Sequence, residues 1–223
     1  MFYEWDWPAA EREFKRALEL NPNYATAHVW YSNYLPVVGR LEEAIASARR
    51  AQELEPLSLM NGSLVGRNLY YARRYDEAIE QLRKVLDLDP NFARAHWFLG
   101  LALEQKGKYP EAIAELQRAF RLSDEPNFLG GLGHTYGVSG NREGAQKTLV
   151  QLLQLSKARY VDSFNLALVH ISLGDKEQAL QGLERACEER FFYVTWLKFD
   201  PRLDGIRTEP RYRDLLRRLK LEP

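Results

Sequence analysis

The chain has 223 residues, 45% of them hydrophobic and 28% charged, which is the ordinary composition of a globular protein. Lys plus Arg and Asp plus Glu both number 31, so the chain lacks the basic excess that a dedicated nucleic-acid-binding protein needs. The single cysteine, Cys187, excludes an intrachain disulfide and fits a reducing compartment.

Two further features concern location. No apolar run approaches the length needed to span a bilayer. The first six residues lack the basic start and apolar core of a secretory signal. We therefore expect a cytoplasmic protein that does not contact membranes.

An internal repeat of about 34 residues dominates the chain and indicates alternating helices. Its marker is a turn slot occupied by Gly39, Arg73, Gly107, Gly140 and Gly174, where glycine accepts a positive φ without penalty. In chain order, the pattern predicts helices over about 7–20, 23–38, 41–54, 57–72, 75–88, 91–106, 109–122, 126–139, 142–155, 158–173 and 176–189. Pro36, in the last turn of its helix, should bend it.

Small residues recur at fixed distances from each turn slot. Five residues after the slot stand Ala44, Ala78, Ala112, Ala145 and Ala179, and seven before it stand Ser32, Gly66, Gly100, Gly133 and Ala167. Two helices approach closely only where the facing side chains are small, so these positions predict tightly packed helix pairs.

The segments Arg40-Leu-Glu-Glu-Ala-Ile and Arg74-Tyr-Asp-Glu-Ala-Ile, with endings such as Leu-Asp-Leu-Asp-Pro, resemble the tetratricopeptide repeat (TPR). The resemblance covers roughly residues 1–189 and is strongest over 23–122, since Asp124 replaces a closing proline further on. It implies an all-α fold: a right-handed TPR superhelix, or α-α solenoid, of antiparallel helix pairs with a C-terminal capping helix.

The expected organisation is a half-unit, five units and a cap. Residues 1–22 would be the second helix of a truncated first repeat, with Trp5 at its turn slot. The five units are 23–56, 57–90, 91–124, 125–156 and 157–189, followed by a cap at 190–223. Because a half-unit leaves part of its apolar face uncovered, we expect a fragment of a longer protein and self-association through this incomplete repeat. A natural half-cap is the alternative.

The last segment leaves the repeat. Phe191, Trp196 and Phe199 belong to a dense, non-periodic aromatic cluster, whereas Tyr212 and Leu215 start one face of a final helix. The stretch from Asp200-Pro-Arg-Leu-Asp onward resembles a tail that follows TPR arrays in bacterial multidomain regulators. We expect it to cover the open end of the solenoid.

No constellation in the sequence predicts catalysis, so the chain is not expected to be an enzyme, nor to bind a cofactor or a metal. The glycines of Gly130-Gly-Leu-Gly-His lie within a helix, where they are packing positions and not a phosphate loop. His28, His96 and His170 stand at packing positions of the repeat, without a second ligand at metal spacing.

Function should lie on the concave wall formed by the first helix of each pair. The positions that the TPR resemblance assigns to this partner-binding groove are Val29, Asn33, Met60, Arg67, Tyr70, Tyr71, Arg94, Trp97, Leu101, Glu104, His134, Phe164 and Leu168. Tyr70, Tyr71 and Trp97 beside two arginines have the composition of a binding hot spot. The alternative is that these aromatics only pack on neighbouring helices.

The groove does not match the TPR subtype that clamps a C-terminal carboxylate, because Val29, Leu64 and Phe98 fill three of its polar positions. We expect instead a protein or peptide ligand with an apolar anchor and an acidic neighbour. The leading hypothesis is a protein–protein interaction scaffold within a larger bacterial signalling or regulatory protein. The alternative is a sensor or autoinhibitory domain that controls an attached kinase, cyclase or DNA-binding domain.

Overall fold

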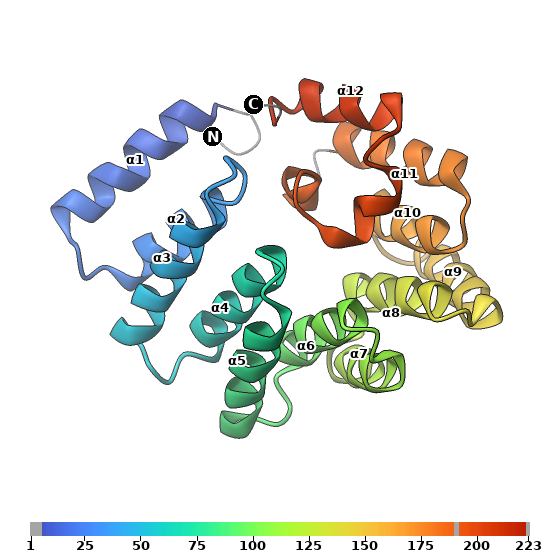
Figure 1. The fold of residues 1–223 in the computed structure, drawn as a ribbon, viewed down its shortest axis with the longest axis horizontal. Coiled ribbons are helices and arrows are strands. Elements are labelled where there is room, and N and C mark those ends of the chain that lie inside the picture. The colour runs from blue at the N-terminus through green and yellow to red at the C-terminus, as the bar shows by residue number, and fades with distance from the viewer. Residues whose placement is uncertain (1–5, 190–191, 222–223) are drawn as a thin grey trace.

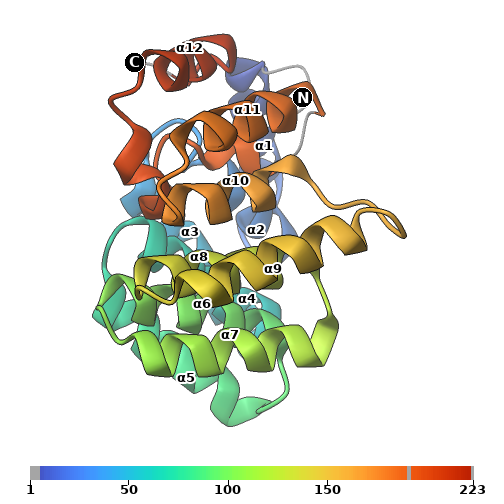
Figure 2. The same cartoon turned by 90° about the vertical axis from the view of Figure 1, so that its right-hand side faces the viewer.

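A computed structural model describes residues 6–189 and 192–221, and all regular structure in these ranges is helical. The helices are α1 (Trp7–Leu20), α2 (Ala25–Tyr34), α3 (Leu41–Leu54), α4 (Leu59–Tyr71), α5 (Tyr75–Leu88), α6 (Ala93–Gln105), α7 (Tyr109–Ser123), α8 (Pro126–Val138), α9 (Arg142–Leu155), α10 (Ser163–Ser172), α11 (Lys176–Glu188), the 3-10 helices η2 (Phe192–Trp196) and η3 (Pro201–Ile206), and α12 (Pro210–Arg218). They wind into an α-α superhelix (Figures 1 and 2), which confirms the expected fold class.

The turn within each helix pair follows one pattern. Gly39, Gly107, Gly140 and Gly174 all have positive φ, and Arg73 adopts φ 61° at the corresponding turn. The backbone N–H one residue later donates to a carbonyl five residues before it, as from Lys108 to Leu103 at 3.0 Å. This is the bond that closes a helix end through a left-handed residue. The slot that carries the sequence repeat is therefore a conformational requirement.

Close packing explains the small residues. The five alanines that follow the turn slots by five residues are completely buried. A Cβ added at Gly66 would lie 2.5 Å from Leu82 Cγ, and one at Gly100 would lie 2.6 Å from Leu116 Cγ. The leucine of the second helix thus rests directly on the backbone of the first.

Helices α2 and α10 are much shorter than the periodicity predicts. Helix α2 ends at Tyr34 and not at 38, because Pro36 has no N–H to continue the ladder. The Ser32 carbonyl freed in this way lies 3.5 Å from Asn68 Nδ2 of α4. Helix α10 begins at Ser163 and not at 158. Asp162 is its N-cap, because the Asp162 side chain accepts the Asn165 N–H at 3.0 Å.

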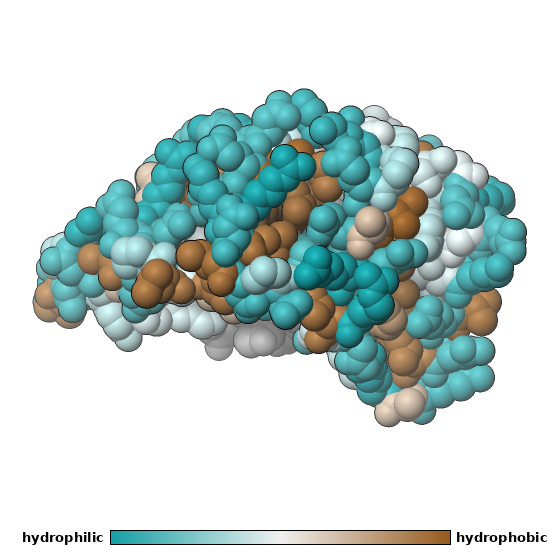
Figure 3. All heavy atoms as spheres, turned by 90° about the horizontal axis from the view of Figure 1, so that it is seen from below, coloured by the Kyte–Doolittle hydropathy of each residue, from teal (hydrophilic) through white to brown (hydrophobic). Residues whose placement is uncertain are grey.

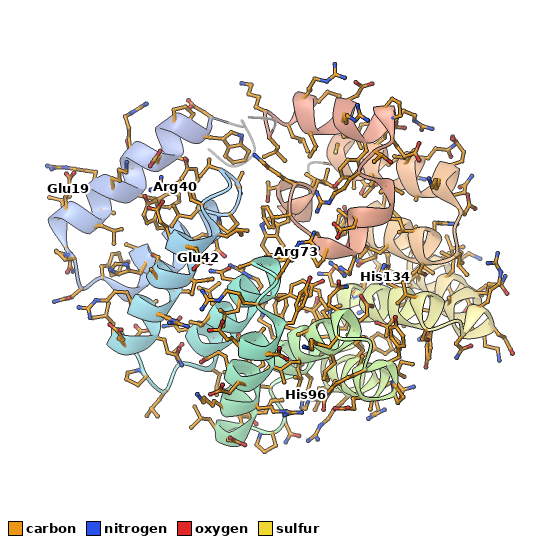
Figure 4. The ribbon with its side chains drawn as sticks, viewed as in Figure 1. Glu19, Arg40, Glu42, Arg73, His96 and His134 are labelled. Atoms are coloured by element: carbon orange, nitrogen blue, oxygen red, sulfur yellow. The ribbon has the colours of Figure 1, made fainter. Side chains whose placement is uncertain are left out.

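The second helix of each pair faces outward and is lined with charges. Arg40, before α3, bonds Glu43 of its own helix and also Glu11 of α1 at 2.5 Å. Arg74 repeats this arrangement one unit later with Glu77 and with Glu42 of α3 at 2.8 Å. Figure 4 labels Arg40 and Glu42, which both lie at the start of α3, and the face in Figure 3 is largely hydrophilic with hydrophobic residues between. Such exposed pairs add little stability individually, so they serve mainly to keep this face solvated.

Two of the four histidines hold loops between units. His28 Nε2 lies 2.9 Å from the Pro22 carbonyl, and His96 Nε2 lies 2.9 Å from the Pro90 carbonyl, so both rings donate across the same kind of loop. The other ring nitrogen of His96, labelled in Figure 4, contacts Glu115 of α7. These contacts give the two residues a structural role.

The two ends of the described chain meet. The indole N–H of Trp7 in α1 donates to the carbonyl of Leu219, just after α12, at 3.3 Å, and Trp7 is buried. Figure 1 shows the start of α1 close to the end of α12 at the top of a ring. Trp5, expected at the first turn slot, and Phe191 lie outside the described residues.

The C-terminal region has two parts. Helix α12 lies on α11, where Arg211 forms ion pairs with Glu184 and Glu177, both at 2.8 Å. Residues 194–206, called here the inner segment, instead turn back into the middle of the ring (Figure 1). They reach α4 and its following turn, which are distant in sequence, through the Trp196–Tyr71 ring contact at 4.9 Å and the 2.8 Å ion pair of Asp204 with Arg73. Covering the open end of the solenoid requires only α12, so the inner segment has a further role beside that of a cap.

Replacing Gly100 by alanine tests the close approach of α6 and α7. The added Cβ would also lie 3.1 Å from the Ala112 carbonyl oxygen, which cannot move aside as a side chain can. We expect a net loss of about 1–2 kcal/mol in the free energy of unfolding, because overpacking exceeds the gain in helix propensity. Denaturant unfolding measures it. Gly205→Ala, with no heavy atom within 4 Å of the added Cβ, is the control and should change little; an equal loss in both variants would contradict this explanation.

The N-cap of α10 gives a pH prediction. Burial raises the pKa of Asp162 to about 7, and the Glu189 carboxylate adds to the effect. The unfolded chain keeps the ordinary value of about 3.9, so the folded state binds the extra proton and stability falls as pH rises from about 4 to 7. In Asp162→Asn this decline should be smaller, so the melting temperature should fall less between pH 5 and 8 than in the unmodified protein.

Asp6→Asn at the N-cap of α1 is the matched control, since Asp6 is exposed and accepts the Ala9 N–H at 3.0 Å in the same way. Its melting temperature should follow the pH dependence of the unmodified protein. Parallel pH curves for Asp162→Asn and the unmodified protein would refute the assignment.

Candidate functional site

The inner wall of the ring is built from α2, α4, α6, α8 and α10, and the inner segment divides it into two openings. The first opening, here called the Met60 pocket, has a volume of about 310 Å³. It is lined by Val29, Trp30, Asn33, Met60, Ser63, Leu64, Arg67, Arg94, Phe98 and Trp196. Neighbouring units and the inner segment therefore share one cavity.

The Met60 pocket combines apolar and cationic groups. Trp30 is 50% exposed and Met60 is 46% exposed, so the rim of the pocket presents two large apolar side chains to solvent. Leu64 and Phe98 are buried beneath them. Among the residues that the structure describes, Arg94 makes no ion pair, so its charge is open to an incoming group. The pocket can accept an apolar side chain next to an acidic one.

Arg67 is held differently from Arg94. It is only 6% exposed, and its Nε and Nη2 donate to Asn68 Oδ1 at 3.3 and 3.0 Å. Its guanidinium carbon lies 4.8 Å from the centre of the Trp196 ring, within range of a cation–π contact. Asn68 in turn donates to the Ala44 carbonyl at 3.1 Å, so Arg67 is positioned by the neighbouring unit.

The central aromatic residues do not line an open wall, and in this respect the sequence expectation is wrong. Tyr70, Tyr71 and Trp97 are 0%, 2% and 3% exposed. The Tyr71 ring packs edge-on against Trp196 at 4.9 Å and against Phe199 at 5.2 Å. The inner segment therefore covers the surface on which the hot spot was expected, in addition to the packing between helices.

Trp97 illustrates that packing between helices. Its ring lies 4.5 Å from Phe98 and 5.2 Å from Phe128 of α8. Three other expected groove residues, Leu101, Phe164 and Leu168, are also at most 2% exposed. Burial of these residues supports the alternative that part of the expected groove set serves the core.

The inner segment carries a buried ion pair of its own. Arg202 donates through Nε and Nη2 to the two oxygens of Asp200 at 3.0 and 2.6 Å, and both residues are nearly inaccessible. The Asp200 carboxylate also accepts the Arg202 backbone N–H at 3.0 Å. Burial raises the pKa of Tyr70 well above its usual value, and the Asp200 charge adds to this effect. The tyrosine next to this pair is therefore neutral.

The second opening, here called the Glu104 pocket, lies at the carboxyl ends of α6, α8 and α10 and has a volume of about 640 Å³. His134 Nδ1 is 3.0 Å from Glu104 Oε2, and the Thr135 hydroxyl donates to the same oxygen at 2.6 Å. Burial alone would raise the pKa of Glu104, but His134 and Thr135 outweigh it and lower the pKa. Figure 4 shows His134 on the inner side of the ring.

The expected groove residues thus fall into three groups. Five of them line the Met60 pocket: Val29, Asn33, Met60, Arg67 and Arg94. Glu104 and His134 line the Glu104 pocket, and the remaining six are buried. The sequence expectation omitted Trp30 and Trp196. The sequence showed that Trp196 belongs to an aromatic cluster outside the repeat. It did not indicate which helices Trp196 would pack against.

No three His, Cys, Asp or Glu side chains in residues 6–189 and 192–221 are grouped as a metal site would need. In the same ranges, no helix is long and apolar enough to cross a membrane.

Three solved structures with similar folds are PilW, a type IV pilus biogenesis factor, a thermophilic TPR protein of Thermus thermophilus, and the APC/C hetero-tetramer Cut9–Hcn1. PilW has 18% identity and a TM-score of 0.62, with 86% of this chain and 90% of that one covered. The Thermus protein has 18% identity and a TM-score of 0.62, covering 89% and 100%. The Cut9–Hcn1 chain has 17% identity and a TM-score of 0.65, covering 98% and 47%. At these identities the likeness concerns the fold alone.

Comparison with curated proteins gives no match. Comparison with protein families matches the tetratricopeptide repeat at residues 5–58 and 66–126, and a second tetratricopeptide-repeat model matches at 163–191. These matches cover more than half of the chain and coincide with the helix pairs described above. The chain therefore belongs to the tetratricopeptide-repeat family, whose fold is a scaffold for protein–protein interaction.

Proposed function

We propose that this protein is an interaction scaffold that binds a peptide or helix of a partner protein in the concave groove, entering at the Met60 pocket. The ligand presents an apolar side chain to Leu64 and Phe98 and an acidic side chain to Arg94. The scaffold works without catalysis, in the cytoplasm, as part of a larger bacterial signalling or regulatory protein.

The observation that carries the proposal is the composition of the Met60 pocket. Its rim exposes Trp30 and Met60, and its wall holds Arg94 without a carboxylate partner among the described residues. Large exposed apolar side chains beside an available arginine are typical of protein-binding hot spots. A methionine at the rim can also adapt its shape to different ligands.

A sensor or autoinhibitory role is the second candidate, and one observation favours it. Residues 194–206 of the same chain already occupy the centre of the groove, where Trp196 and Phe199 contact Tyr71. A domain that binds its own segment can exchange that segment for an effector domain or a ligand. The two candidates therefore differ in whether the partner is attached to this chain.

Self-association through α1 remains part of the proposal. Leu20 is 70% exposed at the end of α1, whereas Trp7 and Ala10 are buried within the chain. A second copy would therefore contact the outer end of α1. Concentration-dependent mass in light scattering would support this contact, and a constant monomer mass would argue against it.

Selection from a displayed peptide library against the immobilised protein tests the proposed function. Selected peptides should pair an apolar anchor with Asp or Glu and bind in solution. We expect Arg94→Glu and Met60→Asp to weaken this binding at least about tenfold, because each removes one of the two complementary contacts. Fluorescence anisotropy gives the dissociation constants.

Arg83→Glu on the outer helix α5 is the control, since Arg83 is exposed and lies outside both pockets. It should leave the affinity within about twofold of the original. Selected peptides that bind all three variants equally well would place the site elsewhere and end the proposal for the Met60 pocket.

A further inference from the structure

The inner segment, residues 194–206, is not part of the repeat. It contains the 3-10 helix η3 and the end of η2, and its Trp196, Leu197, Phe199, Leu203 and Ile206 are buried although it lies in the middle of the ring. An aromatic segment without α-helix on the concave wall has the position that a bound peptide would take in such a scaffold.

We propose that the inner segment is an intramolecular ligand of the groove, and that a partner protein displaces it by presenting the same chemistry. That chemistry is two aromatic side chains three residues apart, as in Trp196 and Phe199. The proposal rests on the proposed function and specifies the partner for the same groove.

The contact between segment and wall is mainly aromatic. Trp196 lies under the Arg67 guanidinium at 4.8 Å and against Tyr71 at 4.9 Å, while Phe199 also meets Tyr71 at 5.2 Å. Edge-to-face pairs and cation–π contacts depend on ring geometry and not on one particular sequence. A partner with the same two rings can therefore replace these contacts.

The polar groups of the inner segment are largely satisfied within the segment and its continuation. Arg202 holds both oxygens of Asp200, and Arg207 donates to the Asp200 carbonyl at 2.9 Å. The Tyr212 hydroxyl donates to the Leu197 carbonyl at 2.5 Å. The segment can therefore leave the wall as a unit without breaking its own ion pair, which lowers the cost of displacement.

Arg73 connects the wall to the segment at the solvent-exposed edge. It occupies the one turn slot of the five that is not glycine, with φ 61°, a left-handed conformation that disfavours residues with a side chain. Its Nη2 donates to Asp204 Oδ1 at 2.8 Å, and Arg207 donates to the same oxygen at 2.7 Å. Figure 4 shows Arg73 toward the centre of the ring. A strained arginine in place of glycine indicates a role beyond the turn.

Trp196 couples the inner segment to the entry site. The same ring that packs on Tyr71 also forms part of the Met60 pocket. A ligand that binds beside Trp30 and Met60 therefore touches Trp196 and competes with its position. The tethered segment competes with an effective concentration on the order of millimolar. A partner that first binds at the Met60 pocket is itself held close to the wall, and it can then compete with the segment for the remaining contacts.

The experiment uses the full chain and a fluorescent synthetic peptide of residues 194–207 as the probe. The unmodified protein should bind it weakly, because the inner segment competes. Asp204→Lys repels Arg73 and Arg207 and should tighten binding at least about threefold, and Trp196→Ala should tighten it at least about tenfold, because each weakens the competitor. A probe with alanine for Trp196 and Phe199 should not bind any of these proteins.

Asp214→Lys on α12 is the matched control. Asp214 is similarly exposed and also pairs with an arginine, Arg217, but it lies outside the inner segment. It should bind the probe as the unmodified protein does. Circular dichroism confirms that each variant keeps its helices; Asp204→Lys, at an exposed side chain, decides the outcome if Trp196→Ala does not fold.

Three results would overturn the proposal: folded variants that bind the probe no more tightly than the unmodified protein, equal binding of the two probes, or variants that become dimers in light scattering. The last would assign the released segment to a second copy. This result can be told apart from failure of the proposed function. Library-selected peptides could still lose affinity in Arg94→Glu and Met60→Asp, while the variants bind the segment probe no more tightly than the unmodified protein.

Discussion

The structure depends on the distance between the two helices of each pair. In the second and third pairs that distance is set where a leucine of the second helix rests on a glycine of the first, as Leu82 does on Gly66 and Leu116 on Gly100. Dispersion and apolar burial increase with such contact, and an added methyl group would remove the fit. The pairs stack at a fixed angle as a result, and the stack curves until α1 and α12 meet (Figure 1).

This constraint also explains what the sequence predicts well. Small residues and turn glycines must recur at fixed spacing, so the helix pairs, the all-α class and the family follow from local pattern alone. Helix ends depend on single residues: Pro36 shortens α2, and the cap Asp162 delays α10. Both signals were present in the sequence, although periodicity by itself extended the helices past them.

The functional site was only partly predictable, for a physical reason. A repeat register specifies which side chains point to the concave wall, and it selected Met60, Arg67 and Arg94 of the open pocket. It carries no information on segments outside the repeat that return from far along the chain. Trp196 contacts Tyr71 from a distant part of the sequence, and a single contact of this kind produces no repeating pattern in the sequence. The burial of the central aromatics therefore became visible only in the structure.

Arg73 departs from the glycine pattern of the turn slots, and this departure indicates a role beyond the turn. Glycine at the four other turn slots satisfies the backbone without using a side chain. An arginine there adds strain that the helix pair does not need, yet it places a cation 2.8 Å from Asp204 on the inner segment. The ion pair is exposed, so its contribution to stability is small, and the position is better explained by control of the segment than by the fold. A weak contact at the edge of a buried aromatic interface is also the contact that a competing partner can break first.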